Sequence, residues 1–418
     1  MWSHLKEKSI IVPKITSEEI DIQVKPVLKK MEKNGIKLDC EALKNLGLKL
    51  GKKLADLEDR ILELAGLDFN VNSPTQLADV LFHELKLPQD DLKKTKTGVS
   101  TAASELKKIE QSHPIIPLIL EQRELSKLIS TYLKPLPVLV DEDDRIHTTY
   151  GMETTTGRLT SSEPNLQNIP IKGKYGNEIR AAFIASDGYR LVSADYSQVE
   201  LRIVACLADD RAMIKAFESN EDIHTRTASE IFDIETTEVT PGQRRIAKAV
   251  NFGIVYGQTP FGLSQTLVIE TSKAAEYIMR YFDIHKGIKD YINKMIEKAH
   301  ADGYVETIFG MRRYLPNINS RIRYIAEGEE RMAINTPVQG TAAELLKLAM
   351  INLDQKLSKD YPNARMLLTV HDEIVVEAPA NEAKKVAEIV KATMEGVIKL
   401  CIPIEASVGI GGNWSETK

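Results

Sequence analysis

Gly242-Gln-Arg-Arg-Ile-Ala-Lys-Ala-Val-Asn-Phe-Gly-Ile-Val-Tyr256 is the most informative stretch of this chain. Arg244, Lys248 and Phe252 recur every four residues, so on a helix of 3.6 residues per turn they share one face. No acidic residue occurs from 241 to 269. Two cations one turn apart suit a polyphosphate, and the aromatic residues suit a flat ring such as a base. For an isolated pattern of this kind a solvated amphipathic helix is the alternative, so the rest of the chain must decide.

The overall charge argues against a global attraction to acidic polymers. The formal net charge is −5 over 418 residues, so any contact with nucleic acid must come from local patches. One such patch runs from Lys93 to Lys134, with eight basic residues against four acidic ones. A solvated helix face is again the alternative explanation of this patch.

The cysteines and the hydropathy point to an intracellular protein. Cys40, Cys206 and Cys401 match no zinc spacing and no disulfide framework, which predicts reduced, structural thiols. The N-terminus lacks the apolar core of a signal peptide, and no segment is long enough to span a membrane.

Periodicity and breaker residues predict a mixed helix and strand organisation. Helices are expected at 20–34, 41–64, 114–133, 198–207, 329–357 and 381–400, with a helix start at 72–77 and a mainly helical region over 209–324. The helix at 329–357 is expected to be irregular near Pro337. Residues 93–100 read as a loop. Strands are expected at 189–194, 366–370, 374–377 and near 404–409, with a hairpin turn at 371–373.

Two aspartates end apolar strand patterns. Asp195 follows the buried strand at 189–194, and Asp372 lies at the hairpin tip. Mg²⁺ prefers oxygen ligands and often takes one or two carboxylates together with substrate phosphates. The two residues are far apart in sequence, so spacing alone cannot pair them. Turn formation is the alternative role for each.

Read together, six segments resemble the polymerase part of the bacterial DNA polymerase I family (family A). In chain order they are Thr156-Gly-Arg-Leu-Thr-Ser-Ser-Glu-Pro-Asn-Leu-Gln-Asn-Ile-Pro170, Asp195-Tyr-Ser-Gln-Val-Glu-Leu-Arg202, Asp222-Ile-His-Thr225, the helix at 244–256, Asn335-Thr-Pro-Val-Gln-Gly340 and Val370-His-Asp-Glu373. The resemblance covers about 24–414 and includes thumb-like segments at 94–98 and 122–127.

The resemblance implies an α+β right-hand fold, with an antiparallel palm sheet and mainly helical fingers. The implied ranges are an N-terminal remnant at 1–16, a thumb at 17–140, a palm at 141–205 and 325–418, and fingers at 206–324. The palm would bring Asp195 beside Asp372. By resemblance these two residues hold two Mg²⁺ ions, with Mn²⁺ as a substitute, and the backbone carbonyl of Tyr196 adds a ligand. Glu373 is implied as an accessory carboxylate, and a purely supporting role is the equal alternative.

The same resemblance assigns a nucleotide pocket. Arg244 and Lys248 would clamp the triphosphate, and Lys248 would protonate the leaving pyrophosphate, because an ammonium gives up a proton far more readily than a guanidinium. Glu200 would occupy the space that a ribose 2′-hydroxyl needs, and Tyr256 would hydrogen-bond to it. The remaining implied nucleotide contacts are Phe252, His224 and Gln198. Core packing is the alternative for Phe252, a structural role for His224, and surface polarity for Gln198.

The implied DNA contacts fall into two groups. Arg158, Asn335 and Gln339 resemble readers of the minor groove at the primer terminus, where every base pair offers equivalent acceptors. His371 would lie near the primer end. Phosphate contacts from the thumb would come from Arg123, Lys127, Lys93, Lys94 and Lys96, and they should be independent of sequence and sensitive to salt.

The chain departs from the family pattern at three places. Met311 stands where a basic residue is usual, Glu344 replaces an Asp, and His285-Lys286 stands where Tyr-Pro is common. Family members also carry a proofreading exonuclease upstream, and often a 5′ nuclease. The residues before the thumb are too few for either, so synthesis without 3′→5′ or 5′→3′ excision is expected. Whether the chain is a natural short enzyme or part of a longer one stays open.

The leading hypothesis is a monomeric, cytoplasmic DNA polymerase, associated with the nucleoid of a bacterium or acting in a virus-infected cell. Its partners would be primer–template DNA and dNTPs. A non-catalytic DNA-binding module is one alternative, although both aspartates and both cations of the clamp are present. A single-subunit RNA polymerase relative is another, which Glu200 argues against. Reverse transcription is a side activity that the sequence does not grade.

Overall fold

The computed structural model describes residues 10–95, 98–171 and 173–418, which form two compact units. The first contains the chain up to Ile36, His147–Asn168 and Ala185–Lys418, and the second contains Lys37–Ile146 and Ile169–Ile184. Lys96 and most of the expected N-terminal remnant lie outside the described residues. Among the described residues, none of the helices combines the length and hydropathy that a bilayer crossing requires.

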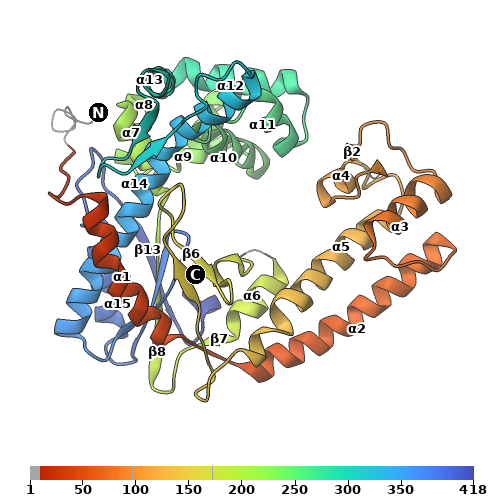
Figure 1. The fold of residues 1–418 in the computed structure, drawn as a ribbon, viewed down its shortest axis with the longest axis horizontal. Coiled ribbons are helices and arrows are strands. Elements are labelled where there is room, and N and C mark those ends of the chain that lie inside the picture. Colours follow the sequence, from red (N-terminus) through yellow and green to blue (C-terminus); the bar gives the residue numbers. More distant parts are fainter. Residues whose placement is uncertain (1–9, 96–97, 172) are drawn as a thin grey trace. The chain divides into compact units, whose positions relative to one another are not determined.

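An antiparallel sheet, of which Figure 1 labels β8 and β13, organises the first unit. Its strands lie in the order β11-β12-β8-β13. The strands are β8 Tyr189–Tyr196, β11 Arg365–Val370, β12 Glu373–Pro379 and β13 Ala406–Gly411. β8 lies between β12 and β13, and its residues Leu191, Val192 and Ala194 are fully buried. The predicted buried strand and the predicted hairpin are therefore both present, and the α+β class is confirmed.

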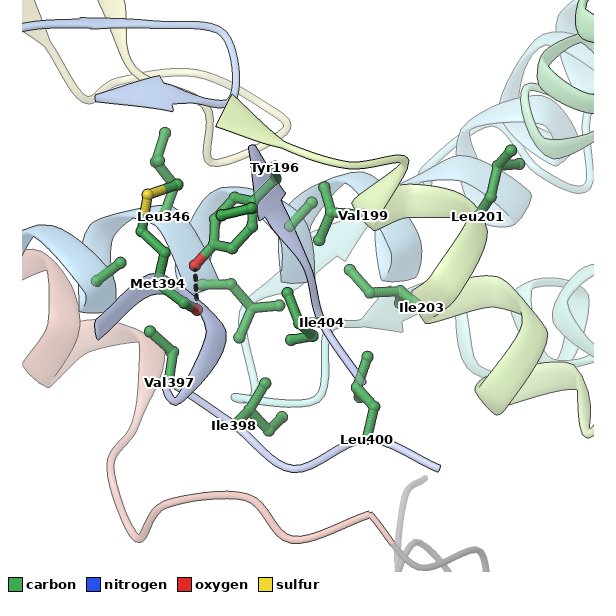
Figure 2. Packing of buried hydrophobic residues seen from close by; sticks show 14 of the residues in the cluster. Tyr196, Val199, Leu201, Ile203, Leu346, Met394, Val397, Ile398, Leu400 and Ile404 are labelled. Atoms are coloured by element: carbon green, nitrogen blue, oxygen red, sulfur yellow. Dashed lines mark hydrogen bonds between the residues drawn. The ribbon is translucent and has the colours of Figure 1, made fainter. Parts of the chain in front are cut away.

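Helices cover this sheet because each buries an apolar face against it or against a neighbouring helix. They are α1 Ser17–Asn34, α7 Val199–Ala208, α14 Arg323–Asp360 and α15 Ala383–Glu395. α15 packs on β8 and β13, and α1 packs on α14 and β11 (Figure 1). In the core, the hydroxyl of Tyr196 donates to the carbonyl oxygen of Met394 at 2.9 Å (Figure 2).

α14 is longer than predicted and continues through Pro337. A proline in a helix removes one backbone hydrogen bond, and here the neighbouring Thr336 hydroxyl donates to the carbonyl oxygen of Met332 at 2.7 Å. Almost every residue from 333 to 351 is buried. Burial of that stretch stabilises the helix against the cost of the proline.

The remaining helices of the first unit follow α7. They are α8 Arg211–Glu218, α9 Ile223–Phe232, α10 Pro241–Val255, α11 Pro260–Leu267, α12 Thr271–Ile284 and α13 Lys286–Asp302. Two small antiparallel pairs complete the unit: β5 Thr149–Gly151 with β6 Thr160–Ser162, and β9 Tyr304–Glu306 with β10 Arg312–Tyr314. α9 packs on α10, and α13 packs on both α7 and α14.

The second unit is built around two long helices, α2 Cys40–Ala65 and α5 Ile115–Leu128, which pack on each other. Its other helical segments are α3 Pro74–Asp79, α4 Ala103–Lys108, α6 Lys174–Ala181 and short turns at 80–84, 129–133 and 136–138. Its strands are β1 Ile36–Leu38 with β4 Arg145–Ile146 and β7 Phe183–Ile184, and β2 Lys94–Thr95 with β3 Gly98–Val99. The segment at 93–100, expected to be a loop, thus contains a short strand pair.

The first unit includes α1, which lies within the range expected for the thumb, and the bounds of the thumb stay a prediction. α1 carries buried Ile20, Val24 and Met31 along one face, and that face contacts α14 and β11 of the first unit. The second unit begins only at Lys37. The division between palm and fingers stays a prediction, because both expected ranges fall mainly within one compact unit.

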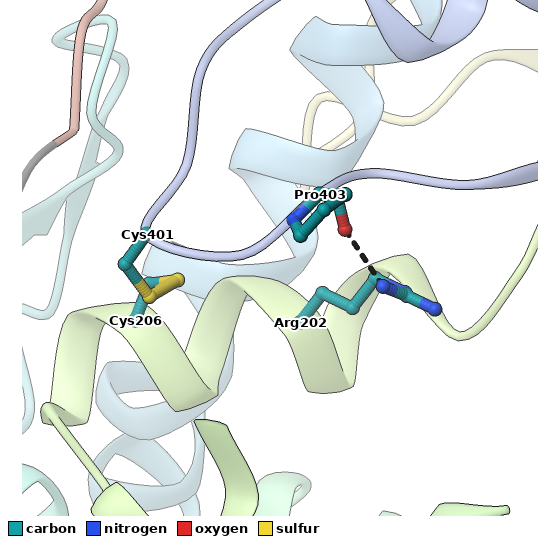
Figure 3. Close-up of a disulfide and its surroundings, with 4 residues drawn as sticks. All are labelled: Arg202, Cys206, Cys401 and Pro403. Carbon is teal, nitrogen blue, oxygen red and sulfur yellow. Dashed lines mark hydrogen bonds between the residues drawn. A yellow bond between two sulfur atoms is a disulfide. The ribbon is translucent and has the colours of Figure 1, made fainter. Parts of the chain in front are cut away.

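Cys206 and Cys401 form a disulfide, so the expectation that all three cysteines are reduced is wrong for this pair (Figure 3). Their Cα atoms lie 5.7 Å apart although 195 residues separate them in sequence. The side chain of Arg202 reinforces the same junction by donating to the carbonyl oxygen of Pro403 at 2.7 Å. Sequence spacing gives no sign of this pairing, because the fold alone brings the end of α7 beside the segment before β13. Cys40 is a free cysteine.

His285 occupies a buried charged cluster among the helices that follow α7. Its Nδ1 lies 3.0 Å from Asp210 Oδ1, and its Nε2 lies 3.2 Å from Glu230 Oε2. Burial alone would lower the pKa of His285, but the hydrogen bonds and charges of the two carboxylates outweigh it and raise the pKa to about 9. The imidazolium therefore links α8 and α9 to the junction of α12 and α13.

We expect this cluster to make stability fall at alkaline pH. The pKa of His285 is raised above its unfolded value of about 6.5, so its stabilisation is complete below that value and is lost as pH rises through about 9. The difference in unfolding free energy between wild type and His285→Gln, roughly 1–3 kcal/mol near pH 6.5, should shrink by pH 9.5. Denaturant unfolding at a series of pH values measures it, and a constant difference across that range would contradict the assignment.

Candidate active site

Two strand ends of the central sheet carry the predicted aspartates. Asp195 is the penultimate residue of β8 and pairs across the sheet with Glu373, the first residue of β12. Asp372 lies in the two-residue turn before β12, and its carbonyl oxygen accepts a hydrogen bond of 3.3 Å from the backbone N–H of Tyr196. His371, at the other turn position, has φ +55°, a left-handed conformation in which His is among the better tolerated residues. The tertiary fold thus brings together the two residues that sequence spacing could not pair.

Asp372 is placed where a negative charge is poorly stabilised by the protein. Burial raises the pKa of Asp372 to about 6, the carboxylates of Glu200 and Asp195 add to this effect, and the guanidinium of Arg158 opposes it. A cation at the turn would stabilise the ionised form. Part of the Asp195 side chain stays open to solvent, with a relative accessibility of 44%.

This acidic end fits a hard divalent cation. In the described part of the chain no group of three or more His, Cys, Asp or Glu side chains gathers as a metal site, so the candidate set is two aspartates. Mg²⁺ commonly uses one or two carboxylates and completes its shell with water and substrate phosphates. The Tyr196 ring points into the core, which leaves its backbone at the sheet end, consistent with the predicted carbonyl ligand (Figure 2).

Glu373 is held away from such a role by its own contacts. Its Oε1 accepts hydrogen bonds from the Ser193 hydroxyl at 2.5 Å and from Trp414 Nε1 at 2.7 Å. Its Oε2 lies 3.1 Å from Nζ of Lys418, which is also 3.8 Å from Asp195 Oδ2. These contacts favour the supporting role over metal ligation. The sequence reading missed Ser193, Trp414 and Lys418, and nothing in their spacing could have identified them.

The cationic helix begins where its sequence predicts. Thr240 and Gln243 form a capping box at the start of α10, and Pro241 occupies its first position. The Arg244 side chain is 43% exposed and pairs with Asp222 through two contacts, Nε to Oδ1 at 3.1 Å and Nη2 to Oδ2 at 2.6 Å. Asp222 also caps α9 by accepting from the backbone N–H of Thr225 at 2.7 Å. Desolvation would raise the pKa of Asp222, but the bonds from Arg244 and Thr225 lower it to about 2.

Aromatic residues follow the cations along the same region. Nζ of Lys248 lies 5.9 Å from the centroid of the Phe252 ring, and that ring stacks on Tyr256 with centroids 6.1 Å apart. His224 lies 5.7 Å from Phe252, again between ring centroids. Four predicted nucleotide residues therefore form one contiguous group, called the nucleotide surface below, of which His224 is the buried member: Lys248, Phe252, Tyr256 and His224.

His224 is neutral in this environment. Burial lowers its pKa to about 4, and the charges of Lys248 and Arg244 add to the effect while Asp222 opposes it. Its Nδ1 lies 3.2 Å from the amide nitrogen of Asn251, which can only donate, so the imidazole proton is on Nε2. Any phosphate contact from His224 would be a neutral hydrogen bond and not an ion pair.

Glu200 joins the nucleotide surface to the acidic sheet end. It is 3% exposed, forms an ion pair with Arg158 and accepts a hydrogen bond of 2.7 Å from the Tyr256 hydroxyl. The hydrogen bond expected between Tyr256 and Glu200 is present. Asn335 reaches the same place, since its Nδ2 donates to the carbonyl oxygen of Tyr256 at 3.3 Å.

The other predicted residues occupy varied positions. Gln198 lies just before α7 with φ +46°, Gln339 is a partly buried residue of α14, and His371 is exposed at its turn. In the second unit, Arg123 is engaged with Thr101 through its carbonyl and its hydroxyl oxygen. Three further predicted phosphate contacts of that unit are exposed: Lys93, Lys94 and Lys127.

Comparison with known proteins places this arrangement in a family. The profile of DNA polymerase family A matches residues 40–416. DNA polymerase I of Deinococcus radiodurans is 48% identical over 405 residues, which cover 96% of this chain and 42% of the relative. The thermostable DNA polymerase I of Thermus aquaticus is 47% identical over 403 residues, 96% of this chain and 48% of the relative. The chain therefore spans a little under half the length of these curated relatives.

A solved structure agrees over nearly the whole chain. It is the POL domain of Pol1 from M. smegmatis in complex with DNA primer–template and dNTP. The TM-score is 0.91 at 40% identity, over 95% of this chain and 70% of that one. With the matched profile and the shared fold, the chain belongs to DNA polymerase family A.

Proposed function

We propose that this chain carries out template-directed DNA synthesis, adding deoxynucleotides to a primer 3′-hydroxyl at the acidic end of the central sheet. One observation carries the proposal: a series of charge interactions, hydrogen bonds and ring contacts links Asp372 to the cationic helix. The charges of Glu200 and Arg158 act on Asp372, Glu200 accepts from Tyr256, and the rings of Tyr256 and Phe252 stack beneath Lys248. A site for metal ions thus adjoins a site for a triphosphate and a base. The M. smegmatis relative, solved with DNA primer–template and dNTP, supports the same reading.

In the proposed reaction the primer 3′-hydroxyl loses its proton to water, and its oxygen bonds to the α-phosphorus. The bond from that phosphorus to the oxygen bridging it to the β-phosphate breaks, which releases pyrophosphate. Asp195 and Asp372 would hold two Mg²⁺ ions, which supply charge neutralisation to the attacking and leaving oxygens. Arg244 and Lys248 orient the triphosphate, and Lys248 donates a proton to the departing pyrophosphate. The Glu200 carboxylate is buried and fixed by Arg158 and Tyr256, and it would occupy the space that a 2′-hydroxyl needs. That crowding favours deoxynucleotides over ribonucleotides.

The DNA contacts form the second part of the proposal. Arg158, Asn335 and Gln339 read the minor groove of the terminal base pair, with His371 near the primer end. In the second unit, exposed Lys93, Lys94 and Lys127 bind backbone phosphates. The chain acts as a monomer.

Asp195→Asn tests the metal assignment. Loss of one anionic ligand removes several kcal/mol of charge stabilisation, so kcat for primer extension with Mg²⁺ should fall by about a hundredfold or more. Asp187→Asn is the matched control, because Asp187 is an exposed aspartate just before the opposite end of β8. Robust synthesis by Asp195→Asn would remove the residue from the site.

Asp222→Asn tests whether Arg244 binds the triphosphate. The variant keeps an oxygen to cap α9 but removes the charge that holds Arg244, so the dNTP KM should fall. Both side chains of the pair are about 40% exposed, and such pairs contribute roughly 0.2–1 kcal/mol, so the change should be at most about fivefold. Steady-state kinetics on a fixed primer–template measures it.

Two comparisons accompany that variant. Lys248→Ala removes a cation from the same helix, so it should slow nucleotide addition and raise the dNTP KM. In an Arg244→Ala background, Asp222→Asn should have no further effect on KM. An equal effect of Asp222→Asn with and without Arg244 would contradict the triphosphate clamp.

Lys127→Gln tests the phosphate contacts of the second unit. Affinity for primer–template should decrease for all sequences alike, and the slope of log affinity against log salt should become shallower by about 0.9 for the lost contact. Glu124→Gln, at an exposed position one turn earlier on α5, is the matched control that removes no cation. Fluorescence anisotropy across a salt series provides the measurement, and an unchanged slope for Lys127→Gln would exclude the contact.

A further inference from the structure

The turn between β9 and β10 is fastened to the middle of α14. Thr307 is fully buried at the start of this turn, and its hydroxyl donates to Glu344 Oε1 at 2.9 Å while accepting from the backbone N–H of Met311 at 3.0 Å. The backbone N–H of Ile308 donates to the Thr341 hydroxyl at 3.3 Å. Two consecutive residues at the start of the turn are thus bonded to α14, and the bond from Met311 to Thr307 holds Met311 beside them.

Met311 fills the space above Gly340 of α14. A methyl group built on Gly340 would lie 2.7 Å from Cε of Met311 and 2.5 Å from Cγ2 of Thr307, far inside van der Waals contact. The same position would be 3.6 Å from the carbonyl oxygen of Thr156. Two segments, the turn and the loop at Thr156, thus converge on one glycine of α14, and a side chain there would require Thr307 and Met311 to shift.

The other side of the Met311 thioether meets the loop that precedes β6. A methyl group built on Gly157 would lie 2.9 Å from Sδ of Met311. Gly157 also has φ +72°, a conformation that glycine adopts without strain. The loop is closed by the Thr154 hydroxyl, which donates to the carbonyl oxygen of Arg158 at 2.7 Å. Met311 is therefore held between Gly157 and Gly340.

The neighbours of these two glycines are the predicted minor-groove residues. Arg158 follows Gly157, and Gln339 precedes Gly340. We propose that Met311 is a positioning residue that sets the separation of Arg158 and Gln339, and so their fit to the terminal base pair of the primer. This inference rests on the proposed function, since it assumes that both side chains read the minor groove.

The proposed reading of a base pair tolerates little error in the separation of Arg158 and Gln339. Two donors can test a base pair only if the distance between them is held within a fraction of an ångström, and a misplacement of about 1 Å can cost a hundredfold in rate. Methionine is long and adaptable enough to fill an irregular gap between two backbones. Removing the Met311 side chain leaves no group between Gly157 and Gly340. The contacts among Lys248, Phe252 and Tyr256 do not involve Met311.

Met311→Ala, made in the full chain, should lower kcat on a matched primer terminus by about tenfold, with the dNTP KM within about twofold of wild type. Extension of a mismatched terminus should change much less, so the ratio of matched to mismatched extension should fall by a similar factor. Met311→Leu, which keeps the volume, should restore both quantities. Met279→Ala, at an exposed methionine of α12, is the control for methionine removal.

A double-mutant cycle separates positioning from a merely structural role. If Met311 acts through Arg158, Met311→Ala should add little to the defect of Arg158→Ala. The inference is overturned if Met311→Ala lowers the melting temperature but keeps kcat and the matched-to-mismatched ratio, or if its effect is the same with and without Arg158.

Failure of this inference can be told apart from failure of the proposed function. If Arg158→Ala and Gln339→Ala reduce the matched-to-mismatched ratio while Met311→Ala does not, only the inference falls. If neither Arg158→Ala nor Gln339→Ala changes the ratio, the minor-groove assignment falls and the inference falls with it.

Discussion

The register between β8 and β12 is the constraint on which the rest of the site depends. It places Asp195 opposite Glu373 and next to the turn that holds Asp372, so these three residues lie at the same end of the sheet. Like charges in a partly buried place repel one another unless something compensates them. The fold compensates Glu373 with the Ser193 hydroxyl, the Trp414 indole and the Lys418 ammonium. The pKa of Asp372 stays raised, and a bound cation would lower it by stabilising the ionised carboxylate.

The cations of the site are matched in the same way. Arg158 pairs with Glu200, and Arg244 pairs with Asp222. Under the proposed function, incoming phosphates and bases would compete with these carboxylates, while each ion pair keeps its guanidinium oriented. Solvent-exposed ion pairs such as Arg244 with Asp222 contribute little free energy, so breaking the pair to bind a phosphate would cost little. The buried Glu200 is a different case, because its two partners hold it in one position beside the nucleotide surface.

Two glycines allow close packing between backbone segments near the site. Gly157 and Gly340 have no side chain, and the hairpin turn with Met311 occupies the room that a side chain would need. This close packing connects a loop, a hairpin and α14. Because packed interiors transmit small displacements, the predicted primer-terminus residues share a support that lies outside the reacting atoms.

Much of the local structure could be read from the sequence. The capping box of α10, the apolar run of β8 and the hairpin at 371–373 follow from short-range patterns that act within a few residues. The resemblance of six ordered motifs identified the family and implied a set of site residues, whose roles stay predictions. The pairing of Asp195 with Asp372 entered through that resemblance, because nothing in their spacing implies it.

Other features were decided by the tertiary structure alone. α14 runs on through Pro337 because burial outweighs the lost hydrogen bond, Cys206 meets Cys401 across 195 residues, and α1 joins the first compact unit because its apolar face packs on α14. Asp222 as the partner of Arg244, and Met311 between two glycines, are likewise invisible in the sequence. Local patterns set which segments become helix or strand, since caps and periodicity act over one or two turns. Which distant side chains meet is set by how those segments pack, and no short-range rule contains that information.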